Sequence, residues 1–403
     1  MSTRRVSTKR QPVQVMAKTI SMKALGVLSL GTVLLLSGCI SLDSLNPFSG
    51  SAPKAKVKPL PAFEAKAAIN VLWQAKIGES GNYSLTPALV DASVFVAATD
   101  GSVARFDQGK LAWRTATGQV ISGGVGSDGK LVAVGTAKGE VLALDAASGK
   151  TLWTARVSSE VLAPPAIADG LVVVRSGDSR IVGLEALDGK RRWMYQRNVP
   201  ALALRSYASV LNVGKTTYVG FAGGKLVALA NNNGSTAWEA TVASPKGTTE
   251  LERITDVISS PVLAGNAVCA VAYQGRVACF DVNTGNPLWS REMSSTVGLA
   301  ADEQQVYVTD TAGRIQALSR ESGSSMWLTD KLMTRSPTRP VLVNGFVVVA
   351  DVEGFVHALR KDTGALVGRT KTDDSAVRGD PVGNAAGLVL QTVNGGIYGM
   401  AVQ

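Results

Sequence analysis

Few residues in this chain have types that could carry out covalent chemistry. The 403 residues include one histidine, His357, and three cysteines. A Ser–His–Asp site would need His357, because the imidazole is the base that activates the serine. The segment FVHAL around His357 reads as a β-strand, so we expect its imidazole to face a neighbouring sheet and not a substrate. Nothing else supports such a site, and we expect no enzymatic activity.

The cysteines lack the spacing of a metal site, since no Cys-x-x-Cys pair occurs. Cys269 and Cys279 lie in strand-like segments on either side of the turn Gln274–Gly275. A disulfide could join them in an oxidising compartment. We favour the alternative of two small buried apolar side chains, because strand register cannot be derived from the sequence to one residue.

The third cysteine, Cys39, ends a segment typical of a secretion signal. A basic stretch ends at Lys23, and the apolar run Ala24–Leu36 is too short to span a membrane. The following LSGC motif resembles the bacterial lipobox. This resemblance implies that residues 1–38 are a lipoprotein signal peptide and that Cys39 carries the lipid, including palmitate. Ile40, in place of aspartate, implies sorting to the outer membrane.

The leader also accounts for most of the net charge of +10. It contains six Lys and Arg residues and no acid, so the rest of the chain has a net charge of +4. No basic cluster indicates a nucleic-acid partner. Residues 39–62, rich in Ser, Pro and Lys, are expected to be a flexible tether. Translation could start at Met1, Met16 or Met22.

The remaining sequence is organised by a repeated phrase, seen in DAASGKTLW (Asp145–Trp153). The seven tryptophans mark its copies, with RKDTGALVG as an eighth copy that has Gly368 in the tryptophan position. The tryptophans are Trp73, Trp113, Trp153, Trp193, Trp238, Trp289 and Trp327. Their spacing is close to forty residues, which is the size of one propeller blade.

Each period contains three strand-like runs, a turn and a fourth run that carries the tryptophan. Eight inner three-strand sets follow one another, and the last ends at Gln403 without a fourth strand. The segment Ile69–Gly78 is a fourth strand without three partners. The sequence therefore predicts an all-β, eight-bladed β-propeller of four-stranded antiparallel blades over residues 63–403, closed by the N-terminal strand. The sets begin near Pro87, Gly126, Ala166, Ser209, Pro261, Leu299, Pro340 and Pro381.

The repeated phrase has a structural explanation that needs no cofactor. Its acids, such as Asp145, Glu185 and Asp281, can accept hydrogen bonds from backbone groups of the turn. Its glycine suits a positive φ angle. The tryptophan can bury a large area where two blades meet. We therefore expect the phrase to serve packing, with neither a metal nor a cofactor.

The phrase resembles the tryptophan-docking repeats of the pyrroloquinoline-quinone dehydrogenases. With the lipobox, the short tether and a single ring of eight repeats, residues 39–403 resemble the BamB family of outer membrane assembly lipoproteins. The resemblance implies a non-catalytic subunit of the BAM complex, anchored by lipid on the periplasmic face of the outer membrane. The implied partner is the POTRA region of a BamA-like subunit, with other BAM lipoproteins contacted indirectly.

The resemblance to the family is most specific in two long connections between blades, Val199–Ser209 and Gly247–Pro261. Both should emerge on one face and form a contiguous patch. The resemblance assigns partner binding to residues in each, although Ile258 stands where the family tends to have a second acid. Alternatively, Leu202 and Leu204 begin an inner strand and point into the core. The implied partner-binding residues are Leu202, Leu204, Arg205, Arg253 and Asp256.

Other functions remain to be weighed against this one. A quinoprotein dehydrogenase would have a longer chain, calcium ligands and a vicinal cysteine pair, which this sequence lacks. A periplasmic holdase could bind unfolded barrel precursors by strand addition at a blade edge. A ligand in the central channel also remains open.

Overall fold

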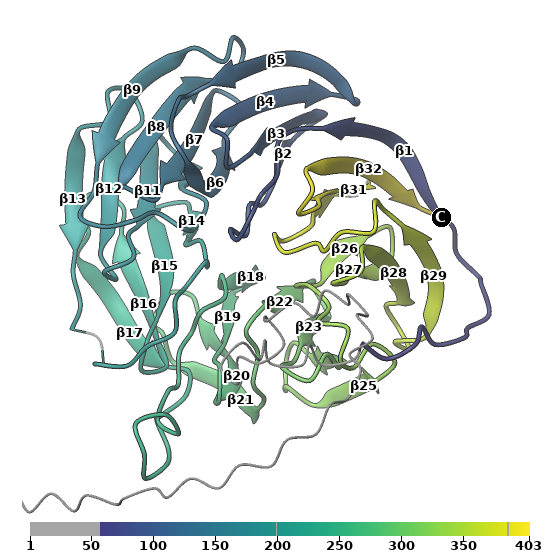
Figure 1. Cartoon of the computed structure of the whole chain (residues 1–403). Helices are drawn as coiled ribbons and strands as arrows, with labels where there is room; N and C mark the ends of the chain where they lie inside the picture. The colour runs from purple at the N-terminus through teal and green to yellow at the C-terminus, as the bar shows by residue number, and fades with distance from the viewer. Residues whose placement is uncertain (1–56, 199, 385–386) are drawn as a thin grey trace, which may run out of the picture. The chain divides into compact units, whose positions relative to one another are not determined.

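A computed structural model describes residues 57–198, 200–384 and 387–403. Cys39, the expected signal peptide and most of the expected tether lie outside these residues. The described part of the chain contains 32 strands in eight four-stranded antiparallel sheets. They follow one another around a ring (Figure 1), which confirms the eight-bladed propeller. In the same part of the chain, no helix is long and apolar enough to cross a membrane.

We name the blades A to H in chain order, with β1 assigned to blade H. Blade A contains β2 (Ala88–Val90), β3 (Ser93–Ala97), β4 (Ser102–Asp107) and β5 (Lys110–Ala116), and blade B contains β6 (Ile121–Ser127), β7 (Leu131–Thr136), β8 (Glu140–Asp145) and β9 (Thr151–Arg156). Blade C contains β10 (Ala166–Ala168), β11 (Leu171–Arg175), β12 (Ile181–Glu185) and β13 (Arg191–Tyr195), and blade D contains β14 (Leu211–Val213), β15 (Thr216–Phe221), β16 (Lys225–Ala230) and β17 (Thr236–Thr241). Blade E contains β18 (Val262–Ala264), β19 (Ala267–Val271), β20 (Arg276–Asp281) and β21 (Pro287–Glu292), and blade F contains β22 (Gly298–Ala301), β23 (Gln305–Thr309), β24 (Ile315–Ser319) and β25 (Ser325–Thr329). Blade G contains β26 (Val341–Val343), β27 (Phe346–Ala350), β28 (Phe355–Arg360) and β29 (Leu366–Lys371), and blade H contains β30 (Val382–Asn384), β31 (Gly387–Gln391), β32 (Gly396–Val402) and β1 (Ile69–Lys76).

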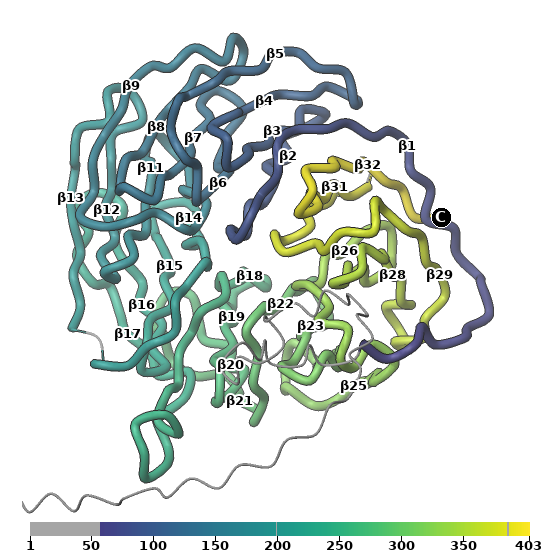
Figure 2. The backbone as a smooth tube through the Cα atoms, in the orientation of Figure 1, coloured from purple at the N-terminus to yellow at the C-terminus, as the bar shows by residue number. Residues whose placement is uncertain are grey.

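The N-terminal strand closes the ring, as predicted. β1 pairs antiparallel with β32, with Ile69 opposite Val402 and Lys76 opposite Gly396. Just before β1, the backbones of Ala68 and Gln403 exchange two hydrogen bonds of 2.8 and 3.0 Å. Figure 2 shows β1 and β32 side by side in blade H. Closure gives the sheet of blade H its full set of four strands, so the edge of β32 is covered by β1.

The tryptophans lock each blade to the next. The Trp153 indole donates from Nε1 to the Ala186 carbonyl at 2.8 Å, across the seam between blades B and C. A Cβ at Gly189, which has a φ of 72°, would lie 2.5 Å from that indole ring. The turn glycine thus supplies both the backbone conformation and the space for the ring. This confirms the packing role predicted for the repeated phrase.

Blade G departs from this pattern because its fourth strand has Gly368 in the tryptophan position. A Cβ at Gly368, the tryptophan position, would lie 2.9 Å from the Ala67 carbonyl oxygen. The amides of Lys66 and Ala67 both donate to the Val367 carbonyl, at 2.9 and 3.0 Å. We call residues 57–68 the strap; it runs along the outer side of blade G into β1 (Figure 2). The strap therefore covers the place that a tryptophan covers elsewhere.

A buried charge cluster holds the strap at its N-terminal end. Arg335, in the β25–β26 connection, donates from Nη1 to the Lys58 carbonyl at 2.8 Å and from Nε to Asp351 at 2.6 Å. His357 is fully buried, with Nε2 2.9 Å from the same Asp351 carboxylate. Arg369 donates from Nε to His357 Nδ1 at 3.3 Å and from Nη2 to the Pro61 carbonyl at 2.9 Å. The chain's single histidine is thus part of a structural cluster.

Our preference for two free thiols at Cys269 and Cys279 was wrong. The two residues are directly opposite each other in the β19–β20 pairing, with their Cα atoms 4.0 Å apart, and they form a disulfide. Both are fully buried. The error came from the strand register, which places the two side chains on the same face at the same level.

Candidate functional site

The two segments singled out by the sequence are connections from an outer strand to the inner strand of the next blade. Pro200–Ser209, the described part of the first segment, lies between β13 and β14; we call it the β13–β14 loop. Leu202 precedes β14 and is 42% exposed, so the alternative of a core position does not hold for this residue. Leu204 is half-buried, and Arg205 is exposed. The loop thus presents a leucine and an arginine to solvent.

The second segment, Gly247–Pro261, joins β17 to β18, and the start of this connection projects from the ring in Figure 1. Arg253 is exposed there. Among the hydrogen bonds of the described residues, none joins Arg253 to the β13–β14 loop. Asp256, three residues later, is 1% exposed. The two charged residues expected to act together therefore have different environments.

Asp256 is the contact that brings the two segments together. Its Oδ2 accepts a hydrogen bond of 2.7 Å from the Leu204 amide, and its Oδ1 accepts one of 3.0 Å from the Gly223 amide. Its backbone also forms isolated bridges with Ala222 and Tyr273. A buried carboxylate that accepts backbone N–H groups fixes those groups in place. Asp256 thus holds the β13–β14 loop from beneath, with its carboxylate turned away from solvent.

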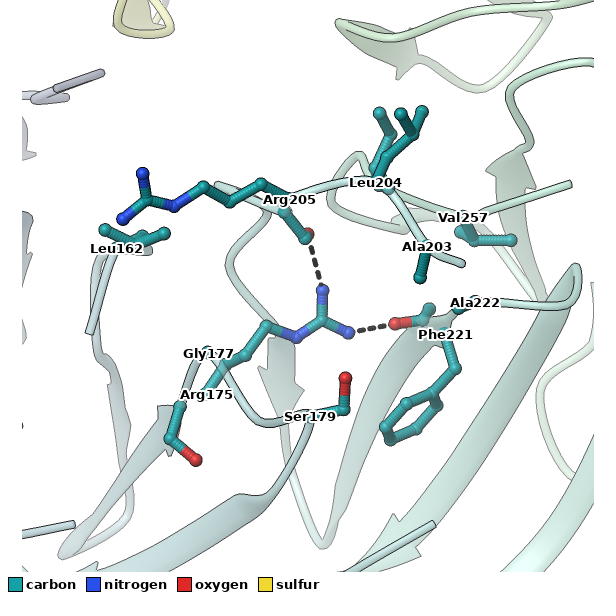
Figure 3. A pocket seen from close by; sticks show the side chains of 14 residues that line it. Leu162, Arg175, Gly177, Ser179, Ala203, Leu204, Arg205, Phe221, Ala222 and Val257 are labelled. Atoms are coloured by element: carbon teal, nitrogen blue, oxygen red, sulfur yellow. Dashed lines mark hydrogen bonds between the residues drawn. The ribbon is translucent and has the colours of Figure 1, made fainter. Parts of the chain in front are cut away.

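A small cavity lies under this loop (Figure 3). Its walls come from blades C and D and from both long connections. Leu162, Ala203, Leu204 and Val257 supply apolar surface, and Arg175 lies at its centre. Arg175 could not be selected from sequence reasoning, because it looks like the ordinary last residue of the strand LVVVR.

Arg175 is a buried cation held by neutral groups. It is 9% exposed and donates from Nη1 to Ser206 Oγ at 2.8 Å and from Nη2 to the Gly220 carbonyl. Its guanidinium carbon lies 5.5 Å from the centre of the Phe221 ring. Burial lowers the pKa of Arg175 to about 10, so the side chain still carries its charge at neutral pH. These contacts tie the loop to blade D.

Arg205 extends the site to a third connection. Its Nη2 lies 3.4 Å from Oε1 of Glu160, in the connection between β9 and β10. Sequence reasoning missed Glu160, although it occupies the same type of connection one blade earlier. Exposed ion pairs of this kind contribute little to stability. The pair can still orient the Arg205 side chain on the surface.

Arg205 also borders a second cavity, of about 140 Å³. This cavity is lined by residues that precede the inner strands of blades A, D, E, F and H, among them Thr86, Ser259, Val297 and Asp380. Inner strands surround the axis of a propeller, so the cavity lies at the mouth of the central channel. The site is therefore continuous with that mouth.

The site has the chemistry of a protein-binding surface. An exposed leucine and an arginine lie beside each other on a loop whose backbone is fixed from below, and such anchors dominate many interfaces. Within the described ranges, no group of three or more His, Cys, Asp or Glu residues could hold a metal ion. The buried acid and histidine of blade G, Asp351 and His357, are bonded to Arg335 and Arg369, the two arginines that hold the strap.

Comparisons with known proteins agree on one family. Its sequence model, described as outer membrane protein assembly factor BamB, matches residues 99–329. Proteins of that name from Bordetella pertussis and Nitrosomonas eutropha are 38% and 40% identical to this chain, covering 90% and 94% of it and 94% and 96% of the relatives. The Escherichia coli protein is 30% identical, over 91% of this chain and 96% of its own length.

Solved structures show the same relationship. The crystal structure of BamB from Moraxella catarrhalis superposes with a TM-score of 0.77 at 28% identity, covering 83% of this chain and 99% of that one. A quinohemoprotein alcohol dehydrogenase from Comamonas testosteroni superposes with a TM-score of 0.66 at 13% identity, over 82% of this chain and 76% of that one. The second likeness concerns the fold alone.

Proposed function

Since this chain belongs to the family of outer membrane protein assembly factor BamB, we propose that it is a non-catalytic scaffold subunit of the machinery that folds and inserts outer membrane β-barrels. Its ring would dock on the POTRA domains of a BamA-like subunit. Docking would orient those domains or bring substrate to them. Contacts with the other lipoproteins of the complex would be indirect.

One observation carries the docking proposal: Asp256 joins the two long connections through the Leu204 amide. This contact fixes the backbone on which Leu202 and Arg205 are exposed. A loop that is rigid before binding loses less conformational entropy when it binds. In this proposal Leu202, Leu204 and Arg205 contact the partner and Arg253 lies at the rim. Asp256 acts through the loop that it holds.

We place the protein on the periplasmic face of the outer membrane, with Cys39 as its lipidated residue. The expected domains remain a signal peptide over 1–38, a segment from 39 to 62 that leads from the lipid, and the propeller over 63–403. Lys58 and Pro61, near the end of that segment, contact blade G. In this arrangement the free part of the tether would end before the strap.

The test is a binding measurement between the chain from residue 40 onward and the isolated POTRA region. The variant Leu202→Ala/Arg205→Ala removes both exposed anchors. Loss of two hot-spot side chains should weaken binding by at least tenfold, about 1.4 kcal/mol. The matched control is Leu187→Ala, since Leu187 is 90% exposed in the turn between β12 and β13.

Titration calorimetry would give the affinities, and circular dichroism would confirm that each variant folds. Equal binding by the wild type and the double variant would show that the partner-binding site does not lie on this loop. No binding by the wild type would contradict the scaffold proposal itself.

A second function, holding unfolded barrel precursors, is favoured by the outer strands. These edge strands expose apolar side chains, including Leu72 at 62%, Leu152 at 54% and Leu328 at 50%. An extended apolar peptide could add to such an edge. If the protein is a holdase, the wild type and the variant Leu202→Ala/Arg205→Ala should bind fluorescent peptides from barrel strands with equal affinity. Absence of peptide binding by the wild type would exclude this second function.

A further inference from the structure

Arg175 differs from an ordinary buried arginine because it has no counter-charge. Among the described residues, none forms a salt bridge with it, and its Nε has no hydrogen-bond partner. Its other two nitrogens are bonded to a hydroxyl and a carbonyl, both neutral. Removing an unpaired charge from water is costly. A nearby anion would therefore be stabilised more here than on an open surface.

The acids of the loops that adjoin the cavity are engaged with other groups. Glu160 lies beside Gly177, but its carboxylate accepts a hydrogen bond from Ser159 and pairs with Arg205. Asp178 pairs with Arg180 at 2.6 Å and accepts a 2.5 Å hydrogen bond from Ser176. Asp256 binds two backbone amides. None of these three carboxylates is hydrogen-bonded to Arg175 or forms an ion pair with it.

The cavity beside Arg175 has the size of one small group. Its volume is about 50 Å³, the room of about three to five water-sized spheres. A side-chain carboxylate fits this space and is an anion that a protein partner can supply. Figure 3 shows the Ser179 hydroxyl pointing toward the Arg175 guanidinium, so a second donor lies at the same place. Leu162, Leu204 and Val257 provide an apolar wall for the stem of an incoming side chain.

We propose that this cavity receives the carboxylate of an aspartate or glutamate side chain from the docking partner, with Arg175 as the cation that binds it. The proposal rests on the docking function above. It gives the surface a recognition element buried behind the exposed anchors Leu202 and Arg205. Arg–carboxylate hydrogen bonds are strong and directional, so an acid at one position of the partner would fix the register of docking.

The first test observes Arg175 directly by NMR of the chain from residue 40 onward, labelled with ¹⁵N-arginine. The Nε signal of Arg175 is assigned by its loss in Arg175→Lys. Acetate, a free carboxylate, should shift this signal, while chloride at equal ionic strength should not. An equal response to both salts, or no response to acetate, would overturn the carboxylate site.

The second test uses affinity for the isolated POTRA region. Arg175→Met should weaken binding at least tenfold, whereas Arg175→Lys, which keeps the charge, should weaken it less than about threefold. Ser206→Ala is the matched control, because it removes a neutral contact of Arg175 and leaves the cation in place. Each variant is first checked for folding by its thermal transition. A Ser206→Ala loss as large as that of Arg175→Met would mean that Arg175 only positions the loop.

Charge reversal separates binding from positioning most clearly. Arg175→Glu should abolish binding, and lysine substitution of one acid of the POTRA region should restore it. A merely structural arginine would not be rescued from the partner side, so failure to find rescue at any acid contradicts the proposal.

The outcomes also separate this proposal from the docking function. If Leu202→Ala/Arg205→Ala weakens binding to the POTRA region but Arg175→Met does not, the carboxylate site is contradicted and the docking function is supported. If acetate shifts Arg175 but the POTRA region does not bind the wild type, the cavity stands and the docking function falls.

Discussion

Arg175 and Arg335 are both buried, yet the protein surrounds them differently. Arg335 is 1% exposed and pairs with Asp351 and Glu353. Burial acts to lower the pKa of Arg335, but the hydrogen bonds and charges of the two carboxylates raise it overall. Among the described residues, Arg175 has no such partners, and burial lowers the pKa of that side chain. In this part of the chain, one guanidinium is paired with carboxylates and the other is not.

The difference shows how to separate a structural charge from one that can bind. In blade G each of the three guanidinium nitrogens of Arg335 donates to an acceptor, in Asp351, Glu353 and the Lys58 carbonyl of the strap. Under the β13–β14 loop the Nε of Arg175 remains without a partner. Burial is common to both sites, whereas compensation of charge is found in only one.

The largest effect expected from this comparison is on stability. Arg335→Met leaves the carboxylate of Asp351 buried with a neutral histidine, and breaking a buried ion pair from one side costs about 3–5 kcal/mol. Arg175→Met should cost clearly less, because no buried anion is left behind. Urea unfolding of both variants measures the difference. Equal losses would mean that the two arginines are equivalent.

A smaller effect is expected from the acid that holds the β13–β14 loop. Asp256→Ala leaves the Leu204 and Gly223 amides without their acceptor and should lower the free energy of unfolding by about 2 kcal/mol. Binding to the POTRA region should also weaken, although the side chain is buried. The reference is Glu303→Ala, which alters an exposed acid in the turn between β22 and β23. Unchanged stability would show that the loop is held by other contacts.

The smallest effect concerns pH and the charge cluster of blade G. Burial lowers the pKa of His357 from 6.5, more than Asp351 can raise it. The folded state therefore binds fewer protons than the unfolded state just below pH 6.5, so stability falls as the pH drops through this range. Each pKa unit corresponds to about 1.4 kcal/mol. Because His357 is the only histidine, His357→Gln should flatten the pH dependence of urea unfolding between pH 6.5 and 5. An unchanged slope would contradict this assignment.

The fold could be predicted because the same sequence phrase recurs from blade to blade. The tryptophan spacing, the turn glycines and the unpaired segment Ile69–Gly78 each indicate the same closed ring. Contacts between distant segments could not be predicted in this way. Nothing in the sequence shows that Lys58 contacts Arg335, or that Cys269 is opposite Cys279 in register.

The site was predictable only as a pair of segments. Their unusual length identified them, but the direction of each side chain depends on the folded loop. Asp256 reads like a surface acid and is buried. Arg175 reads like a strand end, and the absence of a partner for its Nε appears only when its neighbours are in place.

The strap also determines where mechanical load enters the molecule. A pull on the chain before residue 57 reaches Lys58 and Pro61, held by Arg335 and Arg369, before it reaches β1. The hydrogen bonds that the amides of Lys66 and Ala67 donate to the Val367 carbonyl follow. The strand that closes the ring is thus the last element in this series to bear tension. The contacts in front of it can yield and re-form while the eight blades remain intact.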